Sequence, residues 1–241
     1  MLDLHCHILP GVDDGAASME EALAMARFSV ADGIGHIVAT PHCHRHLRLL
    51  RNDILPHVAR FNTALAEAQV PLTVLPGSEI QISTIAAYQS DIENDVLCHL
   101  GGGHAFTLLE FSWHAEDYPP DAPELIAWLR QRGLTPIVAH PERHGFFRDN
   151  PHRLAAIVEA GAWLQVTVDS LIGNHGWASE AGAWELVPAY ADCVLATDAH
   201  NQRRCSGLTV GYAEVRRRLG TKRAEQLRAR SDEVLARLLE S

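Results

Sequence analysis

The chain has 241 residues and a formal net charge of −10, with 47% hydrophobic and 21% charged residues. Single barrels commonly reach this length, so we expect one domain over residues 1–241. The acidic balance argues against a general surface for nucleic acid or anionic membranes. No apolar run approaches the roughly 18 residues of a membrane span, and the amino terminus does not read as a signal peptide.

Cysteine usage points to a reducing compartment. The number of cysteines is odd, they are scattered, and no two of them form a CxxC pair. The sequence therefore predicts reduced thiols and a cytoplasmic protein, with the cysteines at Cys6, Cys43, Cys98, Cys193 and Cys205.

Short apolar strands alternate with amphipathic helices along the chain. We expect strands over residues 1–7, 36–40, 72–75, 105–111, 135–140, 162–168 and 193–197. Helices are expected over 18–33, 52–69, 85–95, 123–132, 150–161 and 181–190, and from 208 onward. Ser18 and Glu21 form a capping box at the first helix, and Asn150 and Pro151 suit the start of the fifth.

Seven strand–helix units predict an α/β fold of parallel strands joined by right-handed crossovers. Nine histidines and carboxylates lie at or just after the ends of six of these strands, or in the loop after the first strand. They are His5, His7, Asp14, His42, Glu79, Glu110, His140, Asp198 and His200. In an open sheet the first and last strands lie too far apart to share ions. A closed barrel brings all carboxyl ends of the strands around one mouth, so we expect a barrel.

The nine residues offer nitrogen and anionic oxygen but no thiolate, which suits Mn²⁺, Fe or Zn²⁺. His5 and His7 share one face of their strand because side chains alternate. Glu79, with two oxygens, is a natural bridge between ions. Clustered divalent ions activate water and hold both oxygens of a phosphoryl transfer, so we expect phosphoester hydrolysis. The alternative, that all nine merely cap strands, must place polar residues independently at six strand ends.

Several motifs resemble those of the PHP (polymerase and histidinol phosphatase) superfamily. They are His5–Cys6–His7, Thr40–Pro41–His42, Gly77–Ser78–Glu79, Ala139–His140–Pro141–Glu142–Arg143 and Asp198–Ala199–His200. The opening stretch, residues 5–15, resembles the bacterial tyrosine-protein phosphatases of capsule and exopolysaccharide clusters. This resemblance spans the chain. It implies a distorted (β/α)7 TIM-like barrel (the PHP fold), three ions that are usually manganese, and hydrolysis of phosphotyrosine on a partner tyrosine kinase.

The resemblance also implies roles for individual residues. One ion would be held by His5, His7, Glu79 and Asp198, a second by Glu79, Glu110 and His140, and a third by Asp14, His42 and His200. A metal-bridging hydroxide would attack phosphorus, so Glu79 belongs to the catalytic machinery. Arg143 would clamp the phosphate, a role that suits the guanidinium fork. A second arginine is expected after the last motif, and the sequence leaves Arg203 and Arg204 equally eligible.

Three points stay open at this stage. Arg143 could instead be a surface residue paired with Glu142. No general acid for the leaving group is identifiable, with His44 only a weak candidate. The substrate could be another phosphate monoester, such as histidinol phosphate, or the chain could bind phosphotyrosine without turnover. The presence of all nine candidate ligands and Arg143 argues against that last alternative.

Overall fold

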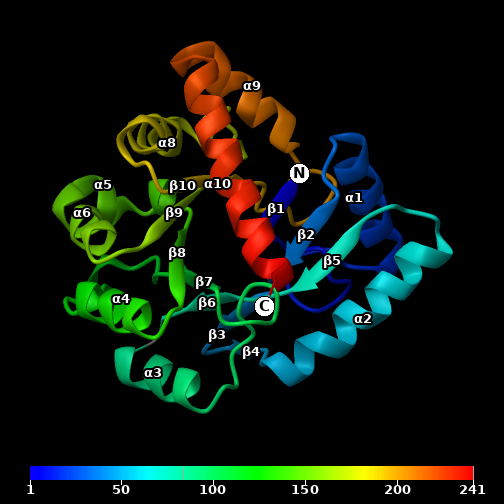
Figure 1. Ribbon diagram of the computed structural model, residues 1–241, viewed down its shortest axis with the longest axis horizontal. Helices are drawn as coiled ribbons and strands as arrows, with labels where there is room; N and C mark the ends of the chain where they lie inside the picture. Colours follow the sequence, from blue (N-terminus) through cyan, green and yellow to red (C-terminus); the bar gives the residue numbers. More distant parts are fainter. Residues whose placement is uncertain (83, 241) are drawn as a thin grey trace.

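Parallel strands and flanking helices follow one another through the chain (Figure 1). The computed structural model describes residues 1–82 and 84–240. The strands are β1 (Leu2–Cys6), β2 (His36–Ala39), β3 (His42–His44), β4 (Leu47–Arg48), β5 (Thr73–Pro76), β6 (Glu79–Gln81), β7 (Phe106–Glu110), β8 (Thr135–Ala139), β9 (Trp163–Thr167) and β10 (Cys193–Ala196).

The longer helices lie outside the strands, with shorter helical turns between them. The α-helices are α1 (Met19–Ala31), α2 (Arg51–Glu67), α3 (Ile85–Glu93), α4 (Ala122–Gln131), α5 (Gly145–Asp149), α6 (Pro151–Glu159), α7 (Val168–Leu171), α8 (Trp177–Ala189), α9 (Leu208–Leu219) and α10 (Thr221–Glu240). Two 3₁₀ turns are η1 (Ala115–Asp117) and η2 (Pro141–Arg143). Within the described residues, no helix is long and apolar enough to cross a bilayer.

The strands form two sheets, one of order β1-β2-β5 and one of order β10-β9-β8-β7-β6-β3-β4. All pairings are parallel except that of β3 with β4. The register of β2 on β5, which pairs Ala39 with Pro76, continues unchanged in β3 on β6, which pairs His42 with Glu79. β2 and β3 are therefore one extended segment with a short interruption, and so are β5 and β6.

The interruptions have local causes. Pro41 has no backbone N–H to give to a ladder, so the second strand breaks there. Gly77 breaks the third strand at a point of close approach, because a Cβ on it would lie 2.6 Å from Cγ1 of Val38. Both interruptions come one or two residues before a candidate ligand, which they help to direct.

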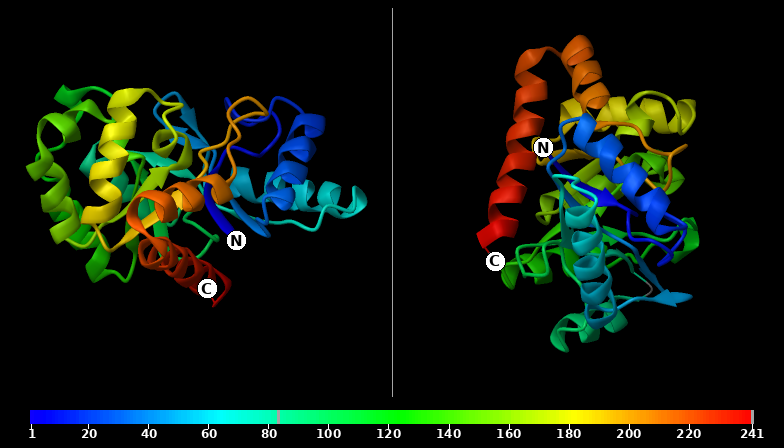
Figure 2. Two further views of the ribbon diagram at one scale, coloured as in Figure 1. Left: turned by 90° about the horizontal axis from the view of Figure 1, so that it is seen from above. Right: turned by 90° about the vertical axis from the view of Figure 1, so that its right-hand side faces the viewer.

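α10 covers the amino-terminal ends of the strands. Ser231 donates a hydrogen bond to the carbonyl of Leu2, and Val234 and Leu238 join the cluster of buried strand residues that includes Leu4 and Leu108. Figure 2 shows this helix along one flank of the molecule. The carboxyl ends of the strands, where the candidate ligands lie, are consequently left free on the opposite side.

The expected parallel α/β organisation is confirmed, and the predicted helices and strands are found with bounds shifted by a few residues. Within residues 1–82 and 84–240 a single closed ladder around a barrel is not observed, because the hydrogen-bonded strands divide into two sheets. His42 and Glu79, expected after strands, are instead the first residues of β3 and β6. The hairpin partner β4 and the short helices α5 and α7 were not expected from the sequence.

Candidate metal centre

Glu79 lies at the middle of the cluster of candidate ligands and is 1% exposed. Its Oε1 lies 2.7 Å from Nε2 of His140, and its Oε2 lies 2.9 Å from Nδ1 of His42. The same Oε2 is 3.4 Å from Nε2 of both His5 and His7. No hydrogen bond satisfies Oε2 among the described residues, although imidazole nitrogens surround it. A buried carboxylate oxygen that receives no hydrogen bond is suited to binding a cation.

All nine predicted ligands fall into four groups whose potential donor atoms lie within 4.8 Å of one another. The groups are His7, Asp14, His42 and His200; His5, Glu79 and His140; His5, His7 and Asp198; and His42, Glu79 and Glu110. His5, His7, His42 and Glu79 each belong to two groups. This sharing is what a cluster of ions with common ligands requires, whereas one isolated ion would need a single group.

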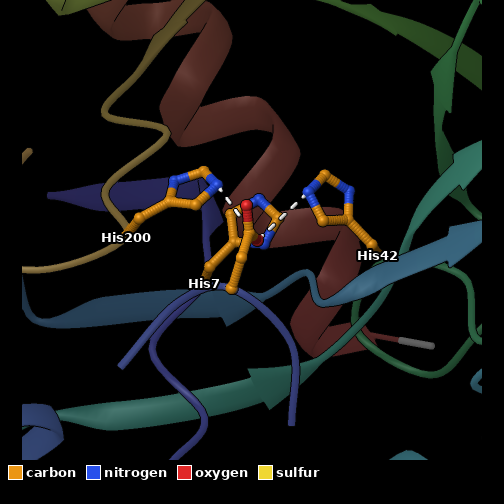
Figure 3. Close-up of side chains that lie close together, drawn as sticks. His7, His42 and His200 are labelled. Atoms are coloured by element: carbon orange, nitrogen blue, oxygen red, sulfur yellow. Dashed lines mark ion pairs between the residues drawn. The ribbon is translucent and has the colours of Figure 1, made fainter. Parts of the chain in front are cut away.

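The group around Asp14 has the most exposed member of the set. Oδ1 of Asp14 lies 3.3 Å from Nε2 of His42 and 3.5 Å from Nε2 of His200. Figure 3 shows His42 and His200 approaching from opposite sides, with His7 between them. The carboxylate of Asp14 is 63% exposed, so this part of the cluster faces the opening to solvent.

The charges in the cluster are unevenly matched. Burial disfavours the ionised form of Glu79, but the charge of His5 and the close imidazoles of His140 and His42 outweigh this effect and hold the pKa of Glu79 well below its usual range. Burial, together with the charge of Glu79, raises the pKa of Glu110 to about 8. Two neighbouring buried carboxylates therefore lack the positive charge that would let both ionise, and a bound cation would supply it.

Polar residues behind the cluster fix which imidazole nitrogen faces it. Nδ1 of His7 lies 2.7 Å from Oδ2 of Asp13, and Nδ1 of His5 lies 2.9 Å from Oε1 of Gln165. Both histidines are thereby left with Nε2 turned inward, and these two Nε2 atoms are 3.2 Å apart. Such hydrogen bonds commonly set the tautomer and orientation of a metal-binding histidine.

Two of the candidate ligands sit in strained backbone. His140, just after β8, has φ of 32°, and Asp198, after β10, has φ of 51°. Residues with a Cβ rarely adopt this left-handed region, and such outliers concentrate at functional sites. The strain turns both side chains out of the strand direction and into the cluster.

The arginines are distinguished by their contacts. Arg143 donates a hydrogen bond from Nη1 to Oδ2 of Asp198 at 2.7 Å, whereas Glu142 accepts one from the N–H of Thr167 at 3.0 Å. The pairing of Arg143 with Glu142 that the sequence left open is therefore not the observed one. Nη2 of Arg204 lies 3.4 Å from the same oxygen of Asp198, while the side chain of Arg203 is exposed.

Other nucleophiles and acids are poorly placed. Cys43 is buried, and this burial raises the pKa of its thiol to about 11, which disfavours a thiolate. All five cysteines are free. His44 extends from β3 with its ring centroid 5.7 Å from that of His42. Partial burial, with the neighbouring histidines, lowers the pKa of His44, so it does not carry the proton of a general acid at neutral pH.

Two orienting residues were missed by sequence reasoning. Gln165 comes from β9, the one strand for which no site residue was expected, and it is fully buried. A glutamine between apolar residues of a buried strand was the available signal. Asp13 directly precedes the predicted ligand Asp14 but was given no role, and its place in the short loop after the His5–His7 motif was the signal there.

An α/β fold that gathers histidines and carboxylates at the carboxyl ends of its strands is the architecture of metal-dependent hydrolases. Residues 1–236 match the model of the family described as capsular polysaccharide synthesis, CpsB/CapC. The chain belongs to this family.

Named relatives agree with this assignment. The chain is 37% identical over 202 residues to the tyrosine-protein phosphatase YwqE of Bacillus subtilis, covering 83% of this chain and 78% of that one. It is 30% identical to the putative tyrosine-protein phosphatase CapC of Staphylococcus aureus, covering 83% and 77%.

A solved structure is also similar. It was described in a study of YwqE from Bacillus subtilis and CpsB from Streptococcus pneumoniae as metal-dependent tyrosine phosphatases. It superposes with a TM-score of 0.89 at 33% identity, over 96% of this chain and 93% of that one. An organophosphorus hydrolase from Deinococcus radiodurans superposes with a TM-score of 0.54 at 15% identity, covering 94% and 89%, which shows a shared fold alone.

Proposed function

We propose that this protein is a metal-dependent protein-tyrosine phosphatase that hydrolyses phosphotyrosine on a protein partner. The observation that carries the proposal is the buried Glu79 carboxylate, whose two oxygens lie against imidazoles from β1 and β3 and from the segments after β1 and β8. The names of the relatives supply the substrate class. A tyrosine kinase of capsule or exopolysaccharide synthesis is the partner that best suits the family's description.

For the metal centre we propose three ions, with manganese favoured over iron or zinc. The ligand sets are His5, His7, Glu79 and Asp198; Glu79, Glu110 and His140; and Asp14, His42 and His200. The overlapping groups in the structure support sharing of Glu79 between two of them. Bound divalent ions would supply a water that is activated at neutral pH and would neutralise charge on the phosphoryl oxygens.

The chain's own residues perform the rest of the reaction. Arg143, at the end of η2, and Arg204, in the loop after β10, both contact Asp198 and would provide guanidinium donors for the non-bridging phosphate oxygens. These donors stabilise charge that grows as the ester bond breaks. Asp13 and Gln165 hold His7 and His5 in fixed orientations, so the site requires little reorganisation. Tyrosine is a good leaving group, which reduces the need for a general acid.

We also infer that the two sheets together form the ring of a distorted barrel. The support is the contact between the segment after β10 and β1, where the N–H of Asp198 donates to the carbonyl of His5 at 2.9 Å and the N–H of His7 donates to the carbonyl of Ala199 at 2.8 Å. The five free cysteines support a cytoplasmic location.

The proposal is tested with purified protein, first stripped by a chelator and then reloaded with single metals. We expect hydrolysis of a phosphotyrosyl peptide to disappear with the metal and to return best with Mn²⁺. Elemental analysis should give two to three ions per chain. The melting temperature should fall on stripping, because an ion that binds only the folded chain stabilises it. Turnover that persists without metal, or a single tightly held ion, would contradict the proposal.

The second candidate is a phosphatase for a small phosphate monoester such as histidinol phosphate, which would use the same centre. A panel that compares a phosphotyrosyl peptide with small esters separates the two. A phosphotyrosine-binding protein without turnover would bind the peptide and release no phosphate.

A further inference from the structure

A cavity of about 360 Å³ opens beside the metal centre, between the β3–β4 hairpin and the segment after β7. Two candidate ligands, His42 and Glu110, form part of its wall, so the cavity begins where a phosphate would be held. Gln81, Ile82 and Trp113 also line the cavity. The volume lies in the range of roughly 300–1,000 Å³ that is typical of ligand pockets.

Trp113 is the large aromatic residue on this wall and is 47% exposed. The covered part of its indole stacks on two imidazoles. The ring centroids lie 5.4 Å from His140 at an angle of 16°, and 4.4 Å from His144 at an angle of 29°. Both histidines are buried, so the indole is backed by rigid structure. Nearly half of the side chain nevertheless remains open, which is unusual for so large an apolar group.

The indole also lies next to the proposed phosphate clamp. The guanidinium carbon of Arg143 is 5.0 Å from the centroid of the Trp113 ring. A phosphate held by Arg143 would therefore lie beside the indole of Trp113. The cavity wall at this point is flat and aromatic, whereas the wall formed by His42 and Glu110 is polar.

We propose that Trp113 is a specificity-determining residue that stacks against the phenyl ring of the phosphorylated tyrosine and thereby selects aryl over alkyl phosphate esters. The inference rests on the proposed function and adds the group that recognises the leaving-group side of the substrate. Aromatic rings gain from offset or edge-to-face packing beyond the area that they bury. An alkyl phosphate, such as that of a phosphoserine, gains none of this.

The test measures the binding of phenylphosphonate and methylphosphonate, two non-hydrolysable probes, to the manganese-loaded protein and its Trp113→Ala variant. We expect the variant to lose affinity for phenylphosphonate roughly 3- to 10-fold, as the usual strength of an aromatic pair implies. Its affinity for methylphosphonate should stay unchanged. Trp113→Phe, which keeps an aromatic ring, should retain most of the preference.

Two controls separate recognition from structural support. Trp177→Ala removes a tryptophan that is 84% exposed and absent from the cavity wall, and it should alter neither affinity. Trp113 also packs on the candidate ligand His140, so the metal content of Trp113→Ala must be measured as well. We expect it to equal that of the unmodified protein. An unchanged preference for phenylphosphonate would overturn the inference, and so would equal weakening of both probes or loss of metal.

Kinetics then distinguish a failure of this inference from a failure of the proposed function on which it rests. With a phosphotyrosyl peptide, Trp113→Ala should raise KM by a similar factor. If the unmodified protein does not hydrolyse the peptide, the proposed function fails. If it does, and the variant keeps the same KM, the inference alone fails.

Discussion

Arg143 donates a hydrogen bond of 2.7 Å to Asp198, a candidate metal ligand 55 residues further along the chain. The carboxylate of Asp198 is 2% exposed, while the side chain of Arg143 is 21% exposed and so reaches from the cluster toward solvent. Arg204 approaches the same oxygen from the loop after β10. The two guanidinium groups thus converge on one edge of the cluster, where an incoming phosphate would replace Asp198 as their partner.

Arg143→Lys is expected to lower kcat nearly as much as Arg143→Ala, by roughly 10- to 10³-fold, or about 1.4–4 kcal/mol. Lysine keeps the charge but cannot make two parallel hydrogen bonds to phosphate oxygens. Steady-state kinetics on a phosphotyrosyl peptide, with metal content measured in parallel, checks this. Loss of metal in either variant would show that Arg143 supports Asp198 instead of the substrate.

Arg204→Ala should weaken substrate binding, whereas Arg203→Ala should leave the kinetics unchanged. The two residues are adjacent and alike in charge, but only the guanidinium of Arg204 contacts Asp198. We expect KM to rise roughly 10-fold for Arg204→Ala, the effect of losing one charge-assisted hydrogen bond. Equal effects of the two substitutions would mean that only the general positive charge of the loop matters.

Glu79→Gln should reduce kcat by about 10³-fold or more, on the scale of removing a principal electrostatic group. Glu110→Gln is the matched comparison, because Glu110 belongs to one of the ligand groups and Glu79 belongs to two. The Glu79 variant should lose more metal and more activity than the Glu110 variant. Near-normal turnover with full metal content in Glu79→Gln would refute a bridging role.

Gln165→Leu should weaken metal binding by roughly 10- to 100-fold, as is typical when a residue that orients a ligand is lost. Oε1 of Gln165 accepts hydrogen bonds from Nδ1 of His5 at 2.9 Å and from the N–H of His140 at 3.1 Å. Gln165→Glu keeps this acceptor and should retain the metal. Competition with a metal-binding dye provides the measurement, and equal affinities in both variants would count against the orienting role.

His99 should make folding sensitive to acid at a place remote from the metal centre. Burial lowers its pKa from 6.5 to about 4, and its Nδ1 has no hydrogen-bond partner among the described residues. The unfolded chain therefore binds a proton near pH 6.5 that the folded chain accepts only near pH 4. Stability is complete above pH 6.5 and falls as the pH drops toward 4.

His99→Leu should remove this part of the acid sensitivity. The free energy of unfolding of the unmodified protein should decrease by about 2–3 kcal/mol more between pH 7 and pH 4 than that of the variant, at about 1.4 kcal/mol per pKa unit. Urea unfolding of both proteins, stripped of metal to remove ligand protonation as a difference, gives the comparison. Parallel pH profiles would show that His99 is already accessible to protons.

The structure brings together the candidate ligands named from the sequence, and most of them follow a run of apolar residues whose period marks a buried strand. Their gathering could be inferred from the parallel topology. The details that depend on three-dimensional packing could not be inferred from the sequence. Pro41 and Gly77 looked like ends of strands, yet the unchanged register of β3 on β6 shows that they are interruptions within them.

The sequence likewise could not show which of two adjacent arginines faces the metal centre. Nothing in the order Arg203–Arg204 distinguishes them, and the turn in which Asn201 accepts hydrogen bonds from both of their N–H groups decides which side chain faces Asp198. Similarly, the partner of Arg143 could not be read from its neighbour Glu142, because Glu142 is turned inward to the N–H of Thr167.

The contact between β1 and the segment after β10 affects when the metal centre can form during synthesis and folding. It joins residues 5 and 198, and candidate ligands lie on both sides of it. During synthesis the first histidines leave the ribosome long before their partners Asp198 and His200 exist. Contacts so distant in sequence form late in folding. A complete metal cluster can therefore assemble only after residue 200 has been synthesised, which keeps a shorter growing chain from becoming an active hydrolase.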